Sequence, residues 1–118
     1  MIKLKNLTSN FQFKRLLNQK KIHTDYFSIY FGKSLSEKNN KKLNISFIIK
    51  KKVGNSVARN KIKRRLREAV RKDLKNKKNI DINYSYIIFG KSKTLSEKYS
   101  IISDELDKTF LKIKQMNI

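Results

Sequence analysis

The sequence predicts an α+β fold, a single-domain α/β sandwich over residues 1–118 with helices on a small mixed sheet in the order αββαβα. Three observations predict it. The chain of 118 residues suits one hydrophobic core. Hydrophobic residues make up 38% and gather in short runs with helical or strand periodicity. Glycines and polar clusters separate those runs, with no Pro-rich or Gly-rich linker between them.

The first two elements are an amphipathic helix and an aromatic strand. A helix over about residues 9–20 is predicted by apolar side chains at i, i+3 and i+4, which are Phe13, Leu16 and Leu17. Residues 8–10, Thr-Ser-Asn, supply N-cap candidates. Residues 26–31 are aromatic and β-branched and end at Gly32, which predicts a strand.

A second strand leads into a basic helix. Apolar and polar residues alternate over 43–52, with Ile45, Phe47 and Ile49 on one face, as in a half-buried strand. Gly54 ends this strand, and the next two residues, Asn and Ser, can cap a helix over 57–75. That helix has an apolar face of Ile62, Leu66, Ala69 and Val70.

The last two elements are a strand and a helix. Residues 84–89 predict a third strand, ended by Gly90. Residues 94–97, Thr-Leu-Ser-Glu, have the spacing of a capping box and predict the start of the final helix. Its inner face is expected to carry Tyr99, Ile102, Leu106, Phe110 and Ile113.

Charge points to a polyanionic partner. Thirty Lys and Arg against nine Asp and Glu give a formal net charge of +21, and this self-repulsion would be relieved by nucleic acid or, second, by an anionic membrane surface. The absence of Cys excludes disulfides and thiolate metal sites and suits a cytoplasmic protein. The apolar runs are too short to span a bilayer, and the first residues lack the apolar stretch of a signal peptide.

The polar side of the 57–75 helix is almost wholly cationic. Only Glu68 and Asp73 interrupt its bases, whereas a helix stabilised by i, i+4 ion pairs would interleave acids. Phosphate binding explains such a density of cationic side chains, since each neutralised phosphate releases counterions and Arg binds phosphate oxygens bidentately. The Gly54 turn allows close backbone approach at the helix start, where free N–H groups favour anions. The stretch therefore predicts a phosphate-binding edge.

Residues 51–68, KKVGNSVARNKIKRRLRE, resemble the signature of the bacterial ribonuclease P protein component. The similarity extends over nearly the whole chain, through Phe13 and Leu16 in the first helix and the order of strands. There are departures from the family pattern. Family members usually carry Arg-Leu-Gly at residues 44–46, Ser at Lys50, Ala at Ser56 and Arg at Lys61.

The resemblance implies a protein subunit of the ribonucleoprotein endonuclease that removes the 5′ leader from precursor tRNA. Its partners would be the catalytic RNA and precursor tRNA, with no membrane and no small-molecule substrate. Hydrolysis would occur on the RNA with Mg²⁺, so the protein itself would carry no catalytic residue, metal site or cofactor. The resemblance also implies a left-handed βαβ crossover, against the usual hand.

Carried over by position, the expected contacts with the catalytic RNA are Lys51, Lys52, Gly54, Asn55, Arg59, Asn60, Lys61, Lys63, Arg64, Arg65, Arg67 and Arg71. The expected contacts with the leader, in a cleft between the first helix and the exposed sheet face, are Phe13, Tyr26, Tyr30, Phe47 and Lys50.

Other functions remain open on residue chemistry alone. An rRNA-binding ribosomal protein would have the same size, charge and α/β content, and a DNA-binding module or membrane-associated basic helix are further alternatives. A nuclease acting by itself is disfavoured, because His23 is the only histidine and no acid is spaced to orient it. Asp104, Glu105 and Asp107 are expected to form a solvated helix face.

Overall fold

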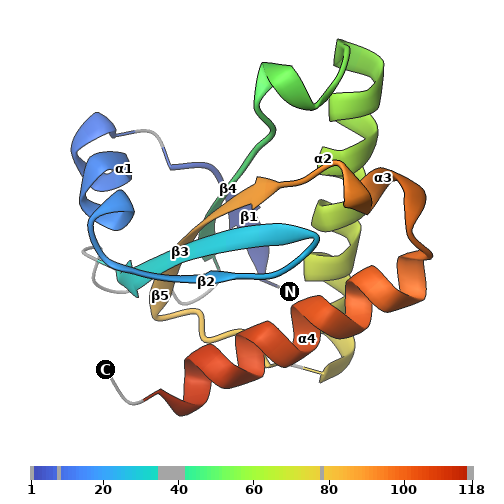
Figure 1. Ribbon diagram of the computed structural model, residues 1–118. Helices are drawn as coiled ribbons and strands as arrows, with labels where there is room; N and C mark the ends of the chain where they lie inside the picture. Colours follow the sequence, from blue (N-terminus) through green and yellow to red (C-terminus); the bar gives the residue numbers. More distant parts are fainter. Residues whose placement is uncertain (1, 8, 35–41, 78, 117–118) are drawn as a thin grey trace.

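A computed structural model describes residues 2–7, 9–34, 42–77 and 79–116 of the protein (Figure 1). Its sheet has five strands in the order β1-β4-β5-β3-β2. The strands are β1 (Lys3–Lys5), β2 (Lys20–His23), β3 (Phe27–Lys33), β4 (Lys42–Ile48) and β5 (Tyr84–Gly90). The α-helices are α1 (Asn10–Leu17), α2 (Ser56–Lys72), α3 (Lys93–Ser96) and α4 (Tyr99–Gln115), with a 3₁₀ turn η1 (Lys51–Val53) and a π-helical turn η2 (Asp73–Lys77).

The sheet is mixed, as predicted. β4 and β5 are parallel neighbours joined by the crossover that contains α2, and β1 adds to β4 in parallel. β3 pairs antiparallel with β5, and β2 pairs antiparallel with β3. The α+β class is confirmed, whereas the left hand of the crossover stays a prediction.

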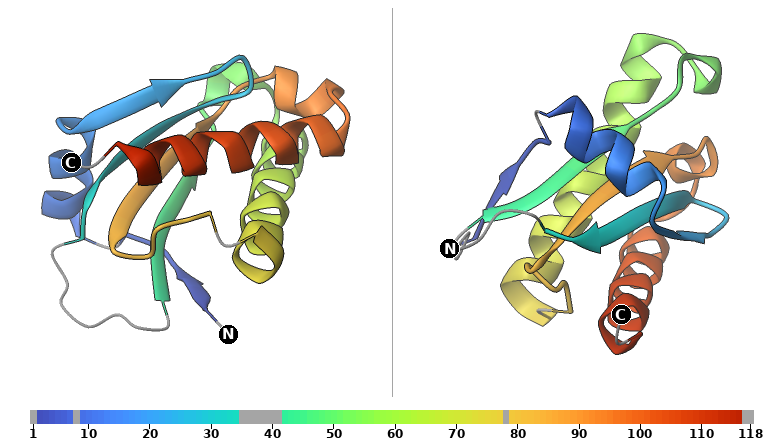
Figure 2. Two further views of the ribbon diagram at one scale, coloured as in Figure 1. Left: turned by 90° about the horizontal axis from the view of Figure 1, so that it is seen from below. Right: turned by 90° about the vertical axis from the view of Figure 1, so that its left-hand side faces the viewer.

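The core lies between one face of the sheet and the helices α2 and α4, which run past each other on that side (Figures 1 and 2). Tyr86 of β5 is fully buried and meets Phe110 of α4 edge to face, with ring centroids 5.1 Å apart. Ile62 and Leu66 carry the buried face of α2, as its 3.6-residue spacing predicts. A side chain at Gly90 would collide with Ile62, so α2 packs directly on the end of β5.

Helix α1 packs on the opposite face, over β3 and β5. Its Leu16 is buried against Gly32, where an added Cβ would lie 3.2 Å from the Leu16 Cδ2 atom. The Ser9 hydroxyl caps the helix by accepting the Gln12 N–H. Tyr30 and Phe89 lie on the same face as Gly32 by strand alternation and remain partly exposed, so α1 covers only part of this face.

The sequence missed three short elements, β1, β2 and α3. The two strands span only three and four residues at the sheet edges, which is too short for an apolar periodicity to identify a strand, so only pairing with a neighbour defines them. The predicted capping box is wrong. The Thr94 hydroxyl is buried and donates to the Tyr26 carbonyl at 2.7 Å, and the last helix begins only at Tyr99.

Candidate RNA-binding surfaces

Two signature side chains shape the turn that starts α2. The Asn55 Oδ1 atom accepts the Ala58 N–H at 2.8 Å and caps the helix. The Arg59 Nη1 atom donates to the Gly54 carbonyl at 2.6 Å, across the same turn. The residues of this predicted anion-binding turn therefore also determine its conformation. Lys51 and Lys52 are exposed on η1, immediately before it.

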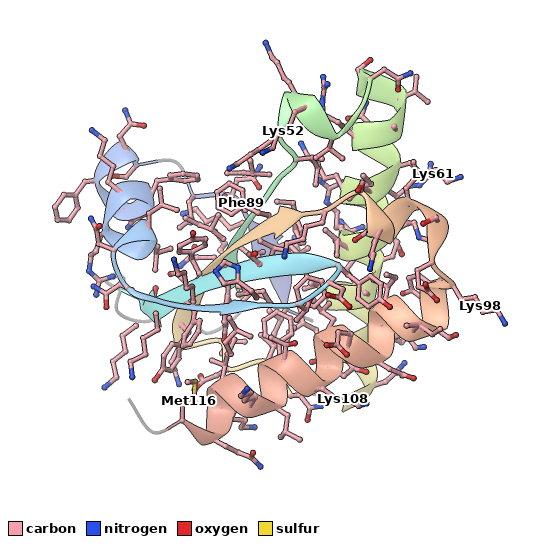
Figure 3. The ribbon with its side chains drawn as sticks, viewed as in Figure 1. Lys52, Lys61, Phe89, Lys98, Lys108 and Met116 are labelled. Carbon is pink, nitrogen blue, oxygen red and sulfur yellow. The ribbon has the colours of Figure 1, made fainter. Side chains whose placement is uncertain are left out.

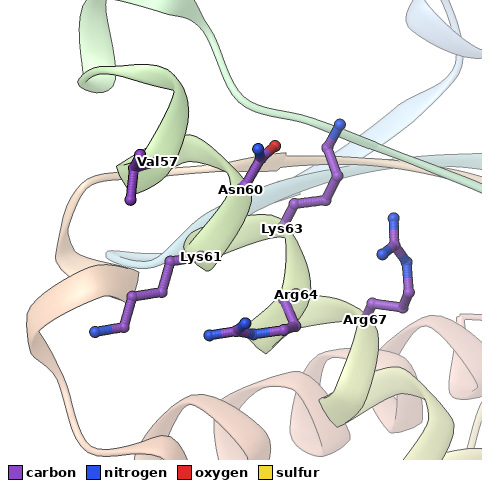
Figure 4. A pocket seen from close by; sticks show the side chains of 6 residues that line it. All are labelled: Val57, Asn60, Lys61, Lys63, Arg64 and Arg67. Carbon is purple, nitrogen blue, oxygen red and sulfur yellow. The ribbon is translucent and has the colours of Figure 1, made fainter.

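The exposed side of α2 carries a shallow basic depression (Figure 4). Lys63 and Arg67 project to one side of the helix axis, and Lys61 and Arg64 project to the other. No acid is among the lining residues, which are Val57, Asn60, Lys61, Lys63, Arg64 and Arg67. Four cations within two helical turns repel one another, and an anion bound between them would relieve that repulsion.

Other bases of the predicted RNA-binding set contact the protein. Arg65 donates from Nη1 to the Leu95 carbonyl at 3.1 Å and from Nη2 to the Glu97 carbonyl, which ties α2 to the α3–α4 connection. Arg71 forms an ion pair with Glu68 at 3.2 Å on the exposed surface of α2. Arg65 therefore positions a neighbouring element, although it belongs to the signature.

A second surface lies on the open face of the sheet. The rings of Tyr30 and Phe89 meet edge to face, with centroids 5.6 Å apart and planes at 73°. The Lys21 Nζ atom lies 5.8 Å from the Tyr30 ring centroid, and the Lys50 Nζ atom lies 5.7 Å from that of Phe89. We call these four residues the aromatic pair and its lysines. In Figure 3, Phe89 lies between α1 and η1, whereas Lys61 projects from the outer side of α2.

The family model for ribonuclease P matches residues 1–114. The chain belongs to the ribonuclease P protein family. It is 34% identical to the ribonuclease P protein component of Fusobacterium nucleatum over 112 residues, covering 91% of this chain and 95% of the relative. It is 30% identical to that of Mycoplasma mycoides, covering 92% and 94%. A shorter match to the Paramagnetospirillum magneticum component is 39% identical but covers 54% of this chain and 47% of that protein.

Solved structures of family members share the fold. The ribonuclease P protein of Thermotoga maritima superposes with a TM-score of 0.73 at 20% identity, covering 92% of this chain and 96% of that one. A Staphylococcus aureus ribonuclease P protein gives a TM-score of 0.67 at 24% identity, covering 93% and 94%.

The residues expected from the family to contact the leader do not all lie together. Tyr30 and Lys50 belong to the aromatic pair and its lysines, and Phe13 is partly buried on α1. The prediction for Phe47 needs a correction. Its side chain is 8% exposed and lies in the core, on the opposite face of the sheet. The Arg67 guanidinium lies 5.7 Å from its ring centroid. Tyr26 precedes β3 and also packs against the core cluster.

The sequence interpretation missed Phe89 and Lys21. The signal was present for Phe89, since it alternates with the buried Tyr84, Tyr86 and Ile88 and must point to the other face. Lys21 could not be predicted as part of this surface without β2, because β2 sets Lys21 opposite Tyr30 in the sheet. His23 is an exposed residue of the same edge strand, with its Nδ1 atom 2.5 Å from the Ser28 Oγ atom.

Metal ligands do not cluster in the described ranges. No group of three or more His, Cys, Asp or Glu side chains there could hold a metal ion. None of the helices within those ranges is long and apolar enough to cross a membrane. The predicted solvated acidic face of α4 is partly wrong, because Asp104 is exposed but Asp107 is buried at 7% exposure.

Proposed function

We propose that this chain is the protein subunit of a ribonuclease P ribonucleoprotein and acts in removing the 5′ leader from precursor tRNA. Its basic depression binds the catalytic RNA, and the aromatic pair with its lysines binds the single-stranded leader. The main support for the proposal is that this member of the family carries two surfaces, which differ in chemistry and lie on different elements.

The depression on α2 suits a folded RNA backbone. Its side chains are cationic and spread around the helix, so they can contact phosphates on more than one strand. Asn60 adds a neutral group that can donate and accept hydrogen bonds. Because binding would release counterions from several phosphates, affinity should fall steeply with salt.

The open sheet face suits a single strand of varying sequence. An unpaired base can stack on Tyr30 or Phe89, and stacking of this kind is worth roughly 1–3 kcal/mol per base with little sequence preference. Lys21 and Lys50 lie beside the two rings and can neutralise phosphates on either side of such a base. A duplex offers no free base faces to this surface, so we assign it to the leader and not to the paired stem.

The chain's own residues bind and orient RNA in this proposal. Mg²⁺ is expected in the ribonucleoprotein, where it would activate water at the scissile phosphate. The described residues do not provide the ligands for a metal ion held by the protein, since no three of their carboxylate or imidazole groups lie close together. No step is therefore assigned to a protein side chain.

Tethered hydroxyl-radical cleavage tests both surfaces together. The chain contains no Cys, so a single introduced thiol can carry an iron chelate at one chosen position. Val57→Cys places it at the rim of the basic depression, where the side chain is 75% exposed. His23→Cys places it on β2, two residues after Lys21 and therefore on the same sheet face as Lys21 and Tyr30. We expect the first probe to cut the catalytic RNA and the second to cut the leader.

The control is Lys108→Cys on the exposed side of α4, which should cut neither RNA strongly. If both surface probes cut only the catalytic RNA, the leader assignment is wrong. If neither probe cuts ribonuclease P RNA but both cut ribosomal RNA, the protein is an rRNA-binding protein and the whole proposal falls.

A further inference from the structure

The short helix α3 lies beside the basic helix α2 and beside the turn that joins β2 to β3 (Figures 1 and 2). On the α2 side, the Arg65 guanidinium donates from Nη1 to the Leu95 carbonyl at 3.1 Å and from Nη2 to the Glu97 carbonyl. A planar guanidinium that donates from both terminal nitrogens fixes the two carbonyls relative to each other. Arg65 is half-buried in this position, whereas its neighbour Arg64 is exposed.

On its other side, the same segment holds the β2–β3 turn, residues 24–26. The Thr94 hydroxyl donates to the Tyr26 carbonyl at 2.7 Å, and the Thr94 side chain is fully buried. The Lys91 N–H donates to the same carbonyl at 2.9 Å, and the Lys91 Nζ atom donates to the Thr24 carbonyl at 2.6 Å. Three donors from residues 91–94 therefore fix the backbone of this turn.

The turn is also bonded within itself. The Thr24 Oγ1 atom accepts the N–H groups of Tyr26 and Phe27 at 3.2 and 3.1 Å. The Thr24 N–H donates to the Phe27 carbonyl at 2.8 Å. The turn is thus a single unit with the ends of both strands, and hydrogen bonds connect it through the backbone of α3 to Arg65 on α2.

The strands that meet at this turn carry half of the aromatic pair and its lysines. Lys21 lies on β2 opposite Tyr30 on β3, and its Nζ atom is 5.8 Å from the Tyr30 ring centroid. β2 is an edge strand that pairs with β3 alone. Because β2 has a strand neighbour on one side only, the position of the turn at its end contributes to where Lys21 lies.

We propose, on the basis of the function proposed above, that Arg65 is a positioning residue for the leader surface. Through α3 it holds the β2–β3 turn in a fixed place relative to the basic depression on α2. Arg65 then contributes to leader binding through the Leu95 and Glu97 carbonyls and not as a phosphate contact, which differs from the role expected from the signature. Residues 91–97 are the connection that keeps the two RNA surfaces in one relative orientation.

The affinity of the reconstituted ribonucleoprotein for precursor tRNA, divided by its affinity for mature tRNA, tests this role. Thr94→Val removes the buried hydroxyl without changing charge, at a side chain that RNA cannot contact, and Lys91 still satisfies the Tyr26 carbonyl. We expect the ratio to fall by about threefold or more. Arg65→Lys keeps the charge but loses the planar fork, so it should lower the ratio similarly. The double variant should lose no more than the larger single loss, because the bonds act in series.

Each variant has a matched control. Thr109→Val makes the same exchange at another buried threonine, whose hydroxyl donates to the Glu105 carbonyl of its own helix at 2.8 Å. Arg64→Lys makes the same exchange at the exposed neighbour of Arg65. Both controls should keep the wild-type ratio. Should Thr94→Val not fold, the comparison of Arg65→Lys with Arg64→Lys decides alone.

Two failures are distinguishable in this experiment. If the wild type prefers precursor tRNA but Thr94→Val and Arg65→Lys keep its ratio, or if the controls lose as much, the positioning role of Arg65 is wrong and the leader surface stands. If the wild type binds both tRNAs equally, the proposed leader surface is wrong, and the positioning role falls with it.

Discussion

Arg64 and Arg65 are adjacent in the sequence but differ in what they can bind. Arg64 is exposed in the basic depression, whereas Arg65 is held by the Leu95 and Glu97 carbonyls. The signature predicts the cationic stretch. It does not predict that Arg64 is exposed and Arg65 bound within the protein, because this depends on where α3 and α4 pack against α2. Phe47 and Phe89 differ in the same way, one in the core and one on the open face.

Arg64→Ala should weaken binding to the catalytic RNA and leave folding intact. Removing one phosphate contact should flatten the dependence of log affinity on log salt by about one unit. A salt series of filter-binding or anisotropy measurements checks this, with Lys108→Ala on the exposed side of α4 as the control that loses the same charge. Equal slopes for Arg64→Ala and wild type would remove Arg64 from the RNA interface.

Phe89→Ala should lower affinity for precursor tRNA with a leader and leave affinity for mature tRNA unchanged. The loss of one stacking platform is expected to cost about 1–3 kcal/mol. Binding of both tRNAs to the reconstituted ribonucleoprotein measures it. Phe11→Ala is the control, because Phe11 is 69% exposed but lies outside the aromatic pair. An equal loss for both tRNAs would contradict a leader site.

The long elements could be predicted from the sequence, and the short ones could not. Strands β3, β4 and β5 and helices α1, α2 and α4 follow from apolar periodicity, since each buries its own apolar face. β1 forms only by pairing with β4, which is distant in the sequence, and β2 forms only by pairing with β3. Thr94 shows a related limit. It has the sequence spacing of a capping box, but its hydroxyl donates to the Tyr26 carbonyl and does not cap a helix.

Gly90→Ala should destabilise the packing of α2 on the sheet. The added Cβ would lie 2.5 Å from the Ile49 Cδ1 atom and 2.7 Å from the Ile62 Cγ2 atom, so the core must shift. Overpacking of this kind typically costs about 1–3 kcal/mol. Urea unfolding measures the change. Gly54→Ala is the comparison, because its Cβ would meet only the Ala58 Cβ atom at 3.2 Å. A Gly90→Ala variant as stable as wild type would contradict the close packing described here.

The whole molecule combines a net charge of +21 with a main core that α2 and α4 cover on one sheet face, whereas α1 covers only part of the other face. Thirty Lys and Arg stand against nine Asp and Glu, and two of these acids, Asp73 and Asp107, are buried. Charge and family signature together made the RNA partner predictable from the sequence. The surface that we propose for the leader could be placed only with the sheet register, which sets Lys21 opposite Tyr30.

Sulfate or phosphate should stabilise the free protein more than chloride at the same ionic strength. Multivalent anions that bind the native basic surfaces but not the unfolded chain shift the unfolding equilibrium by mass action, and they also reduce self-repulsion. Thermal unfolding followed by circular dichroism at low ionic strength measures the effect. A transition that moves equally with chloride and sulfate would show that screening alone acts.

Cleavage of a 5′-extended precursor tRNA tests the central claim most directly. A bacterial ribonuclease P RNA would be assayed at a Mg²⁺ concentration too low for activity without protein, with and without an equimolar amount of this chain. We predict that the chain restores cleavage at the mature 5′ end and that the chain without the RNA cuts nothing. Tight, salt-sensitive binding to that RNA with no restored cleavage, or cleavage by the protein alone, would contradict the account.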